Sequence, residues 1–218
     1  MPIDLATHSA LAVAWLGYFA LHSVAASLGV KRAVAQRWPG AMRGYRLAFN
    51  AVALAALALP LWLSWSIESP WLWRFSGAWR WVADGLAVAA IGGFLFSLRG
   101  YDGGEFIGLR QWRDRARGVE DQERLKISTL HRYVRHPWYL FAIVLIWTRD
   151  MNLAWLISAV AISAYFKLGS LLEERKLIVY HGDAYARYRD AVPGIVPRPW
   201  RHLNATQARE IEAQSRHG

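Results

Sequence analysis

The sequence has no cysteine, and long stretches of it have no charged residue. Its 218 residues include 13 Trp but no Cys, which excludes disulfides and an enzyme-borne thiol nucleophile. Neither residues 5–30 nor residues 47–67 contain Asp, Glu, Lys or Arg. At about 1.5 Å rise per residue, each stretch can cross a hydrocarbon core roughly 30 Å thick. The chain is therefore predicted to be a multi-span membrane protein.

Three further apolar stretches complete the predicted spans. Residues 81–98 contain Asp84 as their one charged residue. Residues 137–148 are too short to span comfortably, and 152–172 are long enough but include Lys167. The polar turn between the last two stretches predicts the tip of a helical hairpin.

The expected architecture is an all-α, polytopic integral membrane helix bundle with about five transmembrane helices. We expect residues 1–203 to form a single membrane domain and residues 204–218 to form a polar, mobile tail. After the last span the helical pattern continues to Tyr180 and breaks at 181–183. Three prolines in 192–200 predict an extended cover over the surface.

The placement of basic residues predicts the orientation in the membrane. The net charge is +10, and basic residues are frequent in the loops 31–46 and 99–135 and in the tail after Leu172. The loop after the second span has Arg74 and Arg80, and the hairpin tip has Arg149. By the positive-inside rule, the amino terminus is expected outside and the carboxyl terminus in the cytoplasm. Contact with anionic headgroups of the lipid bilayer explains the excess charge, so no nucleic-acid partner is expected.

The sequence carries no metal, haem or nucleotide motif. His8 and His22 are fourteen residues apart, about 21 Å along a helix, which is too far to ligate one metal or haem together. We therefore expect buried imidazoles bonded to neighbouring helices, and no metal. Gly100, Gly104 and Gly108 do not follow a strand, so the phosphate-loop and dinucleotide templates fail.

Ionisable residues stand at both feet of the last predicted hairpin, that is, at the two ends away from its tip. His136 precedes the first helix, and Glu173 and Glu174 lie about one bilayer thickness beyond the tip. Both feet are therefore expected at one cytoplasmic interface, and the cost of keeping ionisable groups there is a reason to look for a site between them. Adjacent residues differ by about 100° around a helix, so one Glu faces inward while the other meets water or Arg175. Glu173 is favoured as the inward residue.

The carboxyl-terminal part of the chain carries an ordered set of short motifs. They are Arg-His-Pro-Trp-Tyr at 135–139, Glu-Glu at 173–174, Gly-Asp-Ala-Tyr-Ala-Arg-Tyr at 182–188, and Val-Pro at 192–193 and 196–197. In order and spacing the set resembles the isoprenylcysteine carboxyl methyltransferase superfamily. That resemblance implies a membrane enzyme that binds S-adenosyl-L-methionine in a cytoplasmic pocket roofed by a loop and the tail.

A narrower resemblance extends over most of the chain. Leu-His-Ser-Val-Ala-Ala at 21–26, Phe-Ile-Gly-Leu-Arg-Gln at 106–111 and Glu-Glu-Arg at 173–175 are similar to the methanethiol S-methyltransferase and NnrU-like branch. This branch implies methyl transfer to a small thiol in the bacterial inner membrane. Residues 43–47, Arg-Gly-Tyr-Arg-Leu, depart from the Glu-Arg-Ser-Thr-Tyr pattern of the thiol enzymes.

The superfamily resemblance also implies which residues bind the cofactor. A carboxylate such as Glu173 can bond the ribose or amino group, and an aromatic face such as Tyr139 or Tyr185 can favour the sulfonium. Gly169 stands where the prenylcysteine enzymes place an arginine that meets the substrate carboxylate, so a prenylcysteine acceptor is not expected. The implied cofactor-binding set is His136, Pro137, Tyr139, Glu173, Leu125, Lys126, Tyr185 and Tyr188.

A thiol acceptor would have to lose its proton, since a free thiol with a pKa near 8.5 is only partly ionised at neutral pH. Positive charge from Arg110, Arg135 or Lys167 could lower that pKa, and His131 or His136 could take the proton. The predicted catalytic residues are His136, Arg135 and His131, and the predicted acceptor-binding residues are Arg110, Gln111, His22 and Lys167.

The predicted function is an S-adenosylmethionine-dependent membrane methyltransferase that acts on a small or lipophilic thiol. One alternative is an NADPH-dependent, sterol-reductase-like enzyme, in which Arg132, Arg135 and Arg187 could hold the extra phosphate. Another is a non-enzymatic, NnrU-like membrane protein that supports denitrification or haem handling through His8 and His22.

Overall fold

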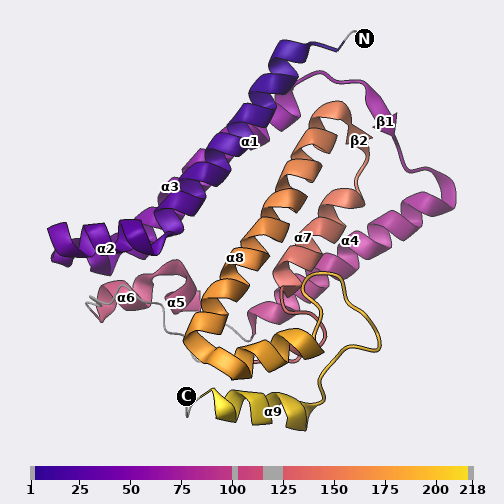
Figure 1. The fold of residues 1–218 in the computed structure, drawn as a ribbon. Coiled ribbons are helices and arrows are strands. Elements are labelled where there is room, and N and C mark those ends of the chain that lie inside the picture. The colour runs from indigo at the N-terminus through magenta and orange to yellow at the C-terminus, as the bar shows by residue number, and fades with distance from the viewer. Residues whose placement is uncertain (1–2, 100–102, 115–124, 216–218) are drawn as a thin grey trace. The chain divides into compact units, whose positions relative to one another are not determined.

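The computed structural model describes residues 3–99, 103–114 and 125–215, and this part of the chain is mostly helical (Figure 1). Two short strands, β1 (Trp71–Trp73) and β2 (Met151–Asn152), pair antiparallel. Two single 3-10 turns, η1 (Pro39–Ala41) and η2 (Leu130–Arg132), interrupt the helical series. The helices are α1 (Leu5–Ala26), α2 (Leu28–Arg37), α3 (Met42–Ser66), α4 (Gly77–Leu98), α5 (Gly103–Ile107), α6 (Leu109–Arg113), α7 (Pro137–Trp147), α8 (Leu153–Ala191) and α9 (Ala205–Gln214).

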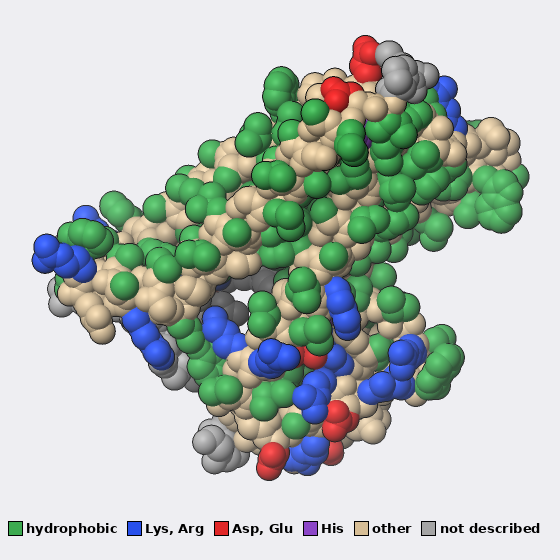
Figure 2. Space-filling model, turned by 45° about the horizontal axis from the view of Figure 1, so that its top comes forward, with side chains coloured by type: hydrophobic (Ala, Val, Ile, Leu, Met, Phe, Trp, Pro, Cys, Tyr) green, Lys and Arg blue, Asp and Glu red, His purple; other side chains and the backbone are tan. Residues whose placement is uncertain are grey.

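Four helices of the described residues are long and apolar enough to cross a membrane: α1, η1 with α3, α4 and α8. Only 11–22% of the residues in their apolar windows are buried in the protein, so most of this apolar surface faces outward, as it does in a bilayer. Figure 2 shows hydrophobic side chains covering helix flanks on one face. The prediction of a polytopic helix bundle is confirmed. The apolar helix α7 has 11 residues, about 16 Å, and is too short to span alone.

The residues fall into two units, and the first comprises Met1–Arg74, Tyr101–Asp121 and Asp150–Ile162. In it α1 packs along α3 around Leu11, Trp15 and Ala154. Trp15 Nε1 donates to Ser158 Oγ (2.9 Å), and Ser158 Oγ shares a hydrogen bond with Ser64 Oγ (2.7 Å). This buried network satisfies the polar groups that a membrane helix cannot leave unpaired.

Also in the first unit, α5 and α6 meet at Gly108, which has φ +100°. A side chain at Gly108 would bring its Cβ to 2.9 Å from Arg46 Cβ, so glycine is required both by conformation and by this close approach. Trp112 lies over Gly44, and the guanidinium of Arg43 stands 4.5 Å from the Trp112 ring centre. The segment 106–112 is thus two short helices held against α3.

The second unit comprises Phe75–Gly100, Gln122–Arg149 and Ser163–Gly218. In it α4 packs against α7, with Phe141 lying over Gly93. Trp138 Nε1 donates to Ser97 Oγ (2.6 Å) at one end of this pair, and Arg149 Nη2 contacts Asp84 Oδ1 (3.1 Å) at the other. The unit therefore joins α4, α7 and the part of α8 from Ser163 onward to the carboxyl-terminal segments.

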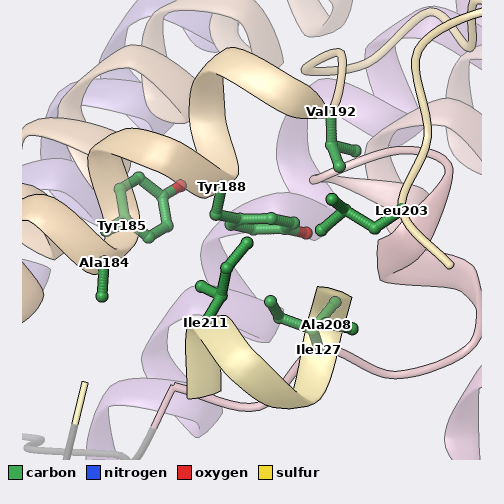
Figure 3. Close-up of a cluster of buried hydrophobic side chains, with 8 residues drawn as sticks. All are labelled: Ile127, Ala184, Tyr185, Tyr188, Val192, Leu203, Ala208 and Ile211. Atoms are coloured by element: carbon green, nitrogen blue, oxygen red, sulfur yellow. The ribbon is translucent and has the colours of Figure 1, made fainter. Parts of the chain in front are cut away.

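The helix α8 is broken at Gly182, where φ is 52° and ψ is −133°. The predicted break at 181–183 is confirmed. The turn lets the last part of α8 fold over a hydrophobic cluster in which Tyr188 lies at the centre (Figure 3). The buried members of this cluster are Ile127, Ala184, Tyr185, Tyr188, Val192, Leu203, Ala208 and Ile211.

The prediction of a mobile tail from residue 204 is wrong for residues 205–214, because they form helix α9. Asn204 caps it with a capping box: its side chain accepts from Gln207 N, and the Gln207 side chain accepts from Asn204 N (both 2.9 Å). Ala208 and Ile211, three residues apart, share the face that is buried in the cluster of Figure 3. The single-domain boundary at 203 therefore cuts through a packed unit.

Replacing Gly182 by alanine tests the break in α8. The Gly182 conformation is one that L residues adopt at a cost of about 1–3 kcal/mol, and we expect Gly182→Ala to lower the free energy of unfolding by that amount. The measurement is unfolding in detergent. Gly85→Ala is the matched control, because a Cβ there meets open space inside α4. Equal stability of Gly182→Ala and the native protein would contradict this account of the break.

Candidate functional site

The start of α7 is fixed by backbone pairing with the carboxyl-terminal segment. Pro137 occupies the first turn of α7, where its missing N–H costs nothing. The preceding two residues donate their backbone N–H groups across the chain: Arg135 N to Pro193 O (2.9 Å) and His136 N to Gly194 O (3.0 Å). The beginning of the proline-rich segment is thus paired with the residues that precede α7, a partner that the sequence does not predict.

Both feet of the hairpin meet at Glu174. Its Oε1 accepts from Arg135 Nη2 (2.7 Å), Arg135 Nε (3.0 Å) and His136 Nε2 (2.9 Å). The side chains of Arg135, His136 and Glu174 are 10%, 7% and 8% exposed, so a buried carboxylate is matched by a buried guanidinium and an imidazole. We call these three residues the clamp.

The expectation that Glu173 faces inward is therefore wrong. Glu174 is the buried member of the pair, whereas Glu173, 48% exposed, stands at the open edge of the clamp. Tyr139 donates its hydroxyl to Glu173 Oε2 (3.4 Å), and His136 Nδ1 lies 3.6 Å from the same oxygen. Glu173 thus keeps a carboxylate at the surface that a ligand can reach.

An aromatic column stands beside the Glu173 carboxylate. The rings of His136 and Tyr139 stack with centroids 5.3 Å apart and an angle of 6°, and Tyr139 and Phe166 stack at 4.7 Å and 5°. Phe166 is not among the residues predicted from the sequence. Its position seven residues before Glu173, two helical turns away on the same face, is the signal that could have found it.

Arg135 is a predicted catalytic residue that the structure places in a supporting position. Besides the two bonds to Glu174, its Nη1 donates to Arg189 O (2.8 Å) and to Val192 O. The guanidinium thus joins α7, α8 and the segment that follows α8. These bonds direct its charge at Glu174 and the carbonyls, which favours a positioning role over one in lowering the pKa of a thiol.

His131 lies in η2, ahead of the clamp. Its Nδ1 shares a hydrogen bond with Ser128 Oγ (2.7 Å), and its backbone oxygen accepts from the Tyr188 hydroxyl (2.7 Å). Burial, with a smaller effect from His136, lowers the pKa of His131 from 6.5 to about 4. The imidazole is therefore neutral near pH 7, and it is a weak base there.

Of the other predicted cofactor-binding residues, three lie in or against the hydrophobic core and one is exposed at the surface. Tyr185 and Tyr188, 2% and 3% exposed, pack edge to face inside the cluster of Figure 3, which supports a packing role for both rings. Leu125 packs against the same cluster, while Lys126 is exposed. Their contact with a cofactor stays a prediction.

The predicted acceptor-binding residues lie in different units. Lys167 is exposed on α8 in the second unit. The other three are in the first unit, where Arg110 Nη1 contacts Glu105 Oε2 (3.4 Å), Gln111 Nε2 donates to Glu105 O (3.2 Å), and the His22 ring lies 5.1 Å from that of Phe49. Acceptor binding by these residues stays a prediction.

His8 has the structural role expected of a buried imidazole. It is 4% exposed, with Nδ1 bonded to Asp4 O (2.7 Å) and Nε2 to Ser69 Oγ (2.8 Å). Both ring nitrogens are therefore occupied, which disfavours a ligand role. The described residues hold no group of three or more His, Asp or Glu arranged for a metal ion.

The fold and the clamp define a multi-pass helical membrane protein with a polar site at the feet of a hairpin. Comparison with known proteins gives its family. The chain is 32% identical over 194 residues to a methanethiol S-methyltransferase of Mycobacterium tuberculosis, across 86% of this chain and 77% of that protein. It is 32% identical over 179 residues to methanethiol S-methyltransferase 2 of Bradyrhizobium diazoefficiens, across 81% and 68% of the two chains. The chain belongs to the methanethiol S-methyltransferase family.

A third relative agrees with this assignment. The chain is 28% identical over 185 residues to a methanethiol S-methyltransferase of a Pseudomonas species, across 78% of this chain and 67% of that protein. No protein-family model matches the chain. No solved structure matches it either. The family resemblance seen in the sequence is thus confirmed by its relatives, and these support a membrane methyltransferase.

The two glutamates are expected to differ in their effect on stability. Glu174→Ala leaves the Arg135 guanidinium buried without its carboxylate, and breaking such a pair costs about 3–5 kcal/mol. We expect that loss in the free energy of unfolding measured in detergent. Glu173→Ala is the matched control and should change it by less than about 1 kcal/mol, because its contacts are long and exposed. Similar losses in the two variants would contradict the assignment.

The lowered pKa of His131 predicts acid sensitivity. Between pH 6.5 and about 4 the unfolded chain holds a proton at His131 that the folded protein does not, so stability falls as pH is lowered through this window. We expect His131→Asn to flatten the dependence of the unfolding midpoint on pH from 6.5 to 4. Parallel profiles for the native protein and the variant would count against a buried neutral imidazole.

Proposed function

We propose that this protein is an integral membrane methyltransferase that uses S-adenosyl-L-methionine to methylate a small thiol. The observation that carries the proposal is the pairing of an exposed Glu173 carboxylate with the aromatic column, both held by the clamp. The relatives are named for methyl transfer to methanethiol, which makes a small thiol the preferred acceptor.

The chemistry of these groups fits the proposed cofactor. Glu173 offers oxygen atoms that can accept hydrogen bonds from an ammonium or from ribose hydroxyls. Tyr139 is stacked between His136 and Phe166, so the ring that can stabilise a nearby cation with a face, by about 0.5–2 kcal/mol, is Phe166 at the end of the column. When bound, the sulfonium cofactor supplies an electrophilic methyl group. Holding that methyl in line with the acceptor is the main task left to the protein.

The clamp also prepares His136 to handle the acceptor proton. Because Nε2 faces the Glu174 carboxylate, it carries the proton of a neutral ring, which leaves Nδ1 as the acceptor. Nδ1 lies on the side of Glu173, toward the open edge of the clamp. His136 can therefore receive the thiol proton at Nδ1, while Arg135 holds Glu174 in place.

The first experiment is calorimetric titration of the purified, folded protein with S-adenosyl-L-methionine. We expect saturable binding to the native protein. Glu173→Gln should weaken it about tenfold or more, since a hydrogen bond to a charged group contributes about 1.5–3 kcal/mol. Glu210→Gln, an exposed position on α9, is the control and should bind as the native protein does. A folded native protein without binding would overturn the proposal.

A second experiment tests the acceptor. Membranes or purified protein supplied with the cofactor and methanethiol should release the methylated thioether, detected in the headspace by gas chromatography. His136→Asn should lower this rate more at pH 6.5 than at pH 9, because a much larger fraction of the thiol is ionised without help at pH 9. Transfer that is equally impaired at both pH values would remove His136 from proton transfer and leave it a structural part of the clamp.

A further inference from the structure

Helix α9 makes contacts that the proposed chemistry does not use. Its buried face, Ala208 and Ile211, packs into the cluster around Tyr188 (Figure 3). At its end, Arg187 contacts Gln214 Oε1, and Ser215 Oγ shares a hydrogen bond of 2.8 Å with His181 Nδ1. The helix is therefore attached to α8 on both sides of the Gly182 turn.

One side chain of α9 reaches a different segment. Glu212 Oε1 accepts a hydrogen bond of 2.5 Å from the backbone N–H of Ile127, 85 residues earlier in the chain. The Ile127 side chain is 7% exposed and belongs to the same cluster. A carboxylate bonded to a backbone N–H at a half-buried position gives a charge-assisted hydrogen bond, which is stronger than a neutral one.

The segment that Glu212 holds leads directly to the clamp. From Ile127 the chain passes through η2, where Leu203 N donates to Arg132 O (3.0 Å), and it reaches Arg135 eight residues later. Leu125 and Lys126 stand just ahead of Ile127. The bond at Ile127 therefore fixes the amino-terminal end of the segment 125–136, whose other end is fixed by the clamp.

We propose that Glu212 is a positioning residue, through which α9 holds the segment 127–136 and with it the clamp residues Arg135 and His136 of the proposed cofactor site. The inference rests on the proposed function. Under this proposal α9 raises the affinity for the cofactor, although no residue of α9 needs to touch the cofactor. The carboxylate acts on the Ile127 backbone, and the chain from Ile127 through η2 carries this constraint to Arg135 and His136.

Hydrogen exchange of the full-length, cofactor-free protein tests the first step. Glu212→Ala should speed exchange of the Ile127 amide about tenfold or more, because its acceptor is lost. Glu212→Gln keeps an oxygen at the same place and should restore much of the protection. Glu210→Ala, exposed on the same helix, is the matched control and should leave exchange unchanged. Native-like exchange in Glu212→Ala would overturn the proposal.

Steady-state kinetics of the same variants test the second step. A positioning role predicts that Glu212→Ala raises the KM for S-adenosyl-L-methionine about tenfold with kcat within about twofold, and that Glu212→Gln rescues it. A merely structural role would lower the amount of active protein and leave KM unchanged, and that result overturns the proposal. If the native protein binds no cofactor, the proposed function fails as well. If the native protein binds the cofactor normally and only the Glu212 variants behave unlike the prediction, the positioning role of Glu212 is wrong and the proposed function stands.

Discussion

The second unit depends on the buried carboxylate of Glu174. One oxygen of this side chain receives three hydrogen bonds from two successive residues of the Arg-His-Pro motif. A buried carboxylate is costly unless it is paired and bonded, so the sequence must place Arg135 and His136 within reach at the same time. That requirement sets the rotation of α8 relative to the start of α7. It also presents the neighbouring Glu173 at the open edge.

The same interaction connects the membrane hairpin to the carboxyl-terminal chain. Arg135 donates to the carbonyl groups of Arg189 and Val192, and its own backbone N–H pairs with Pro193. The segment after α8 is therefore held against the foot of α7 by the residues that complete the clamp. A conformational change in the segment that follows α8 would therefore disturb the clamp directly.

The sequence predicted the membrane helices and the hairpin because charge-free runs and a polar turn are local signals. It also predicted the break at Gly182 and brought His136 and the glutamate pair together. It favoured Glu173 over Glu174 wrongly, because the run of charged residues at 173–176 does not show which side of α8 faces inward, and the rotation of α8 is set by the partners of Glu174. It also missed α9, whose buried face has just two small or medium apolar residues, Ala208 and Ile211, in a polar stretch. In both cases long-range contacts decided the outcome.

Two adjacent carboxylates have different roles: Glu174 holds Arg135 and His136 in place, and Glu173 is the carboxylate proposed to contact the ligand. An experimental structure with bound S-adenosylhomocysteine, the product form of the proposed cofactor, tests this most directly. The account predicts that the Glu173 carboxylate contacts the nucleoside or the amino group while Glu174 keeps its bonds to Arg135 and His136. A structure in which Glu174 leaves the clamp to bind the ligand, or in which the ligand lies away from Glu173, would contradict it.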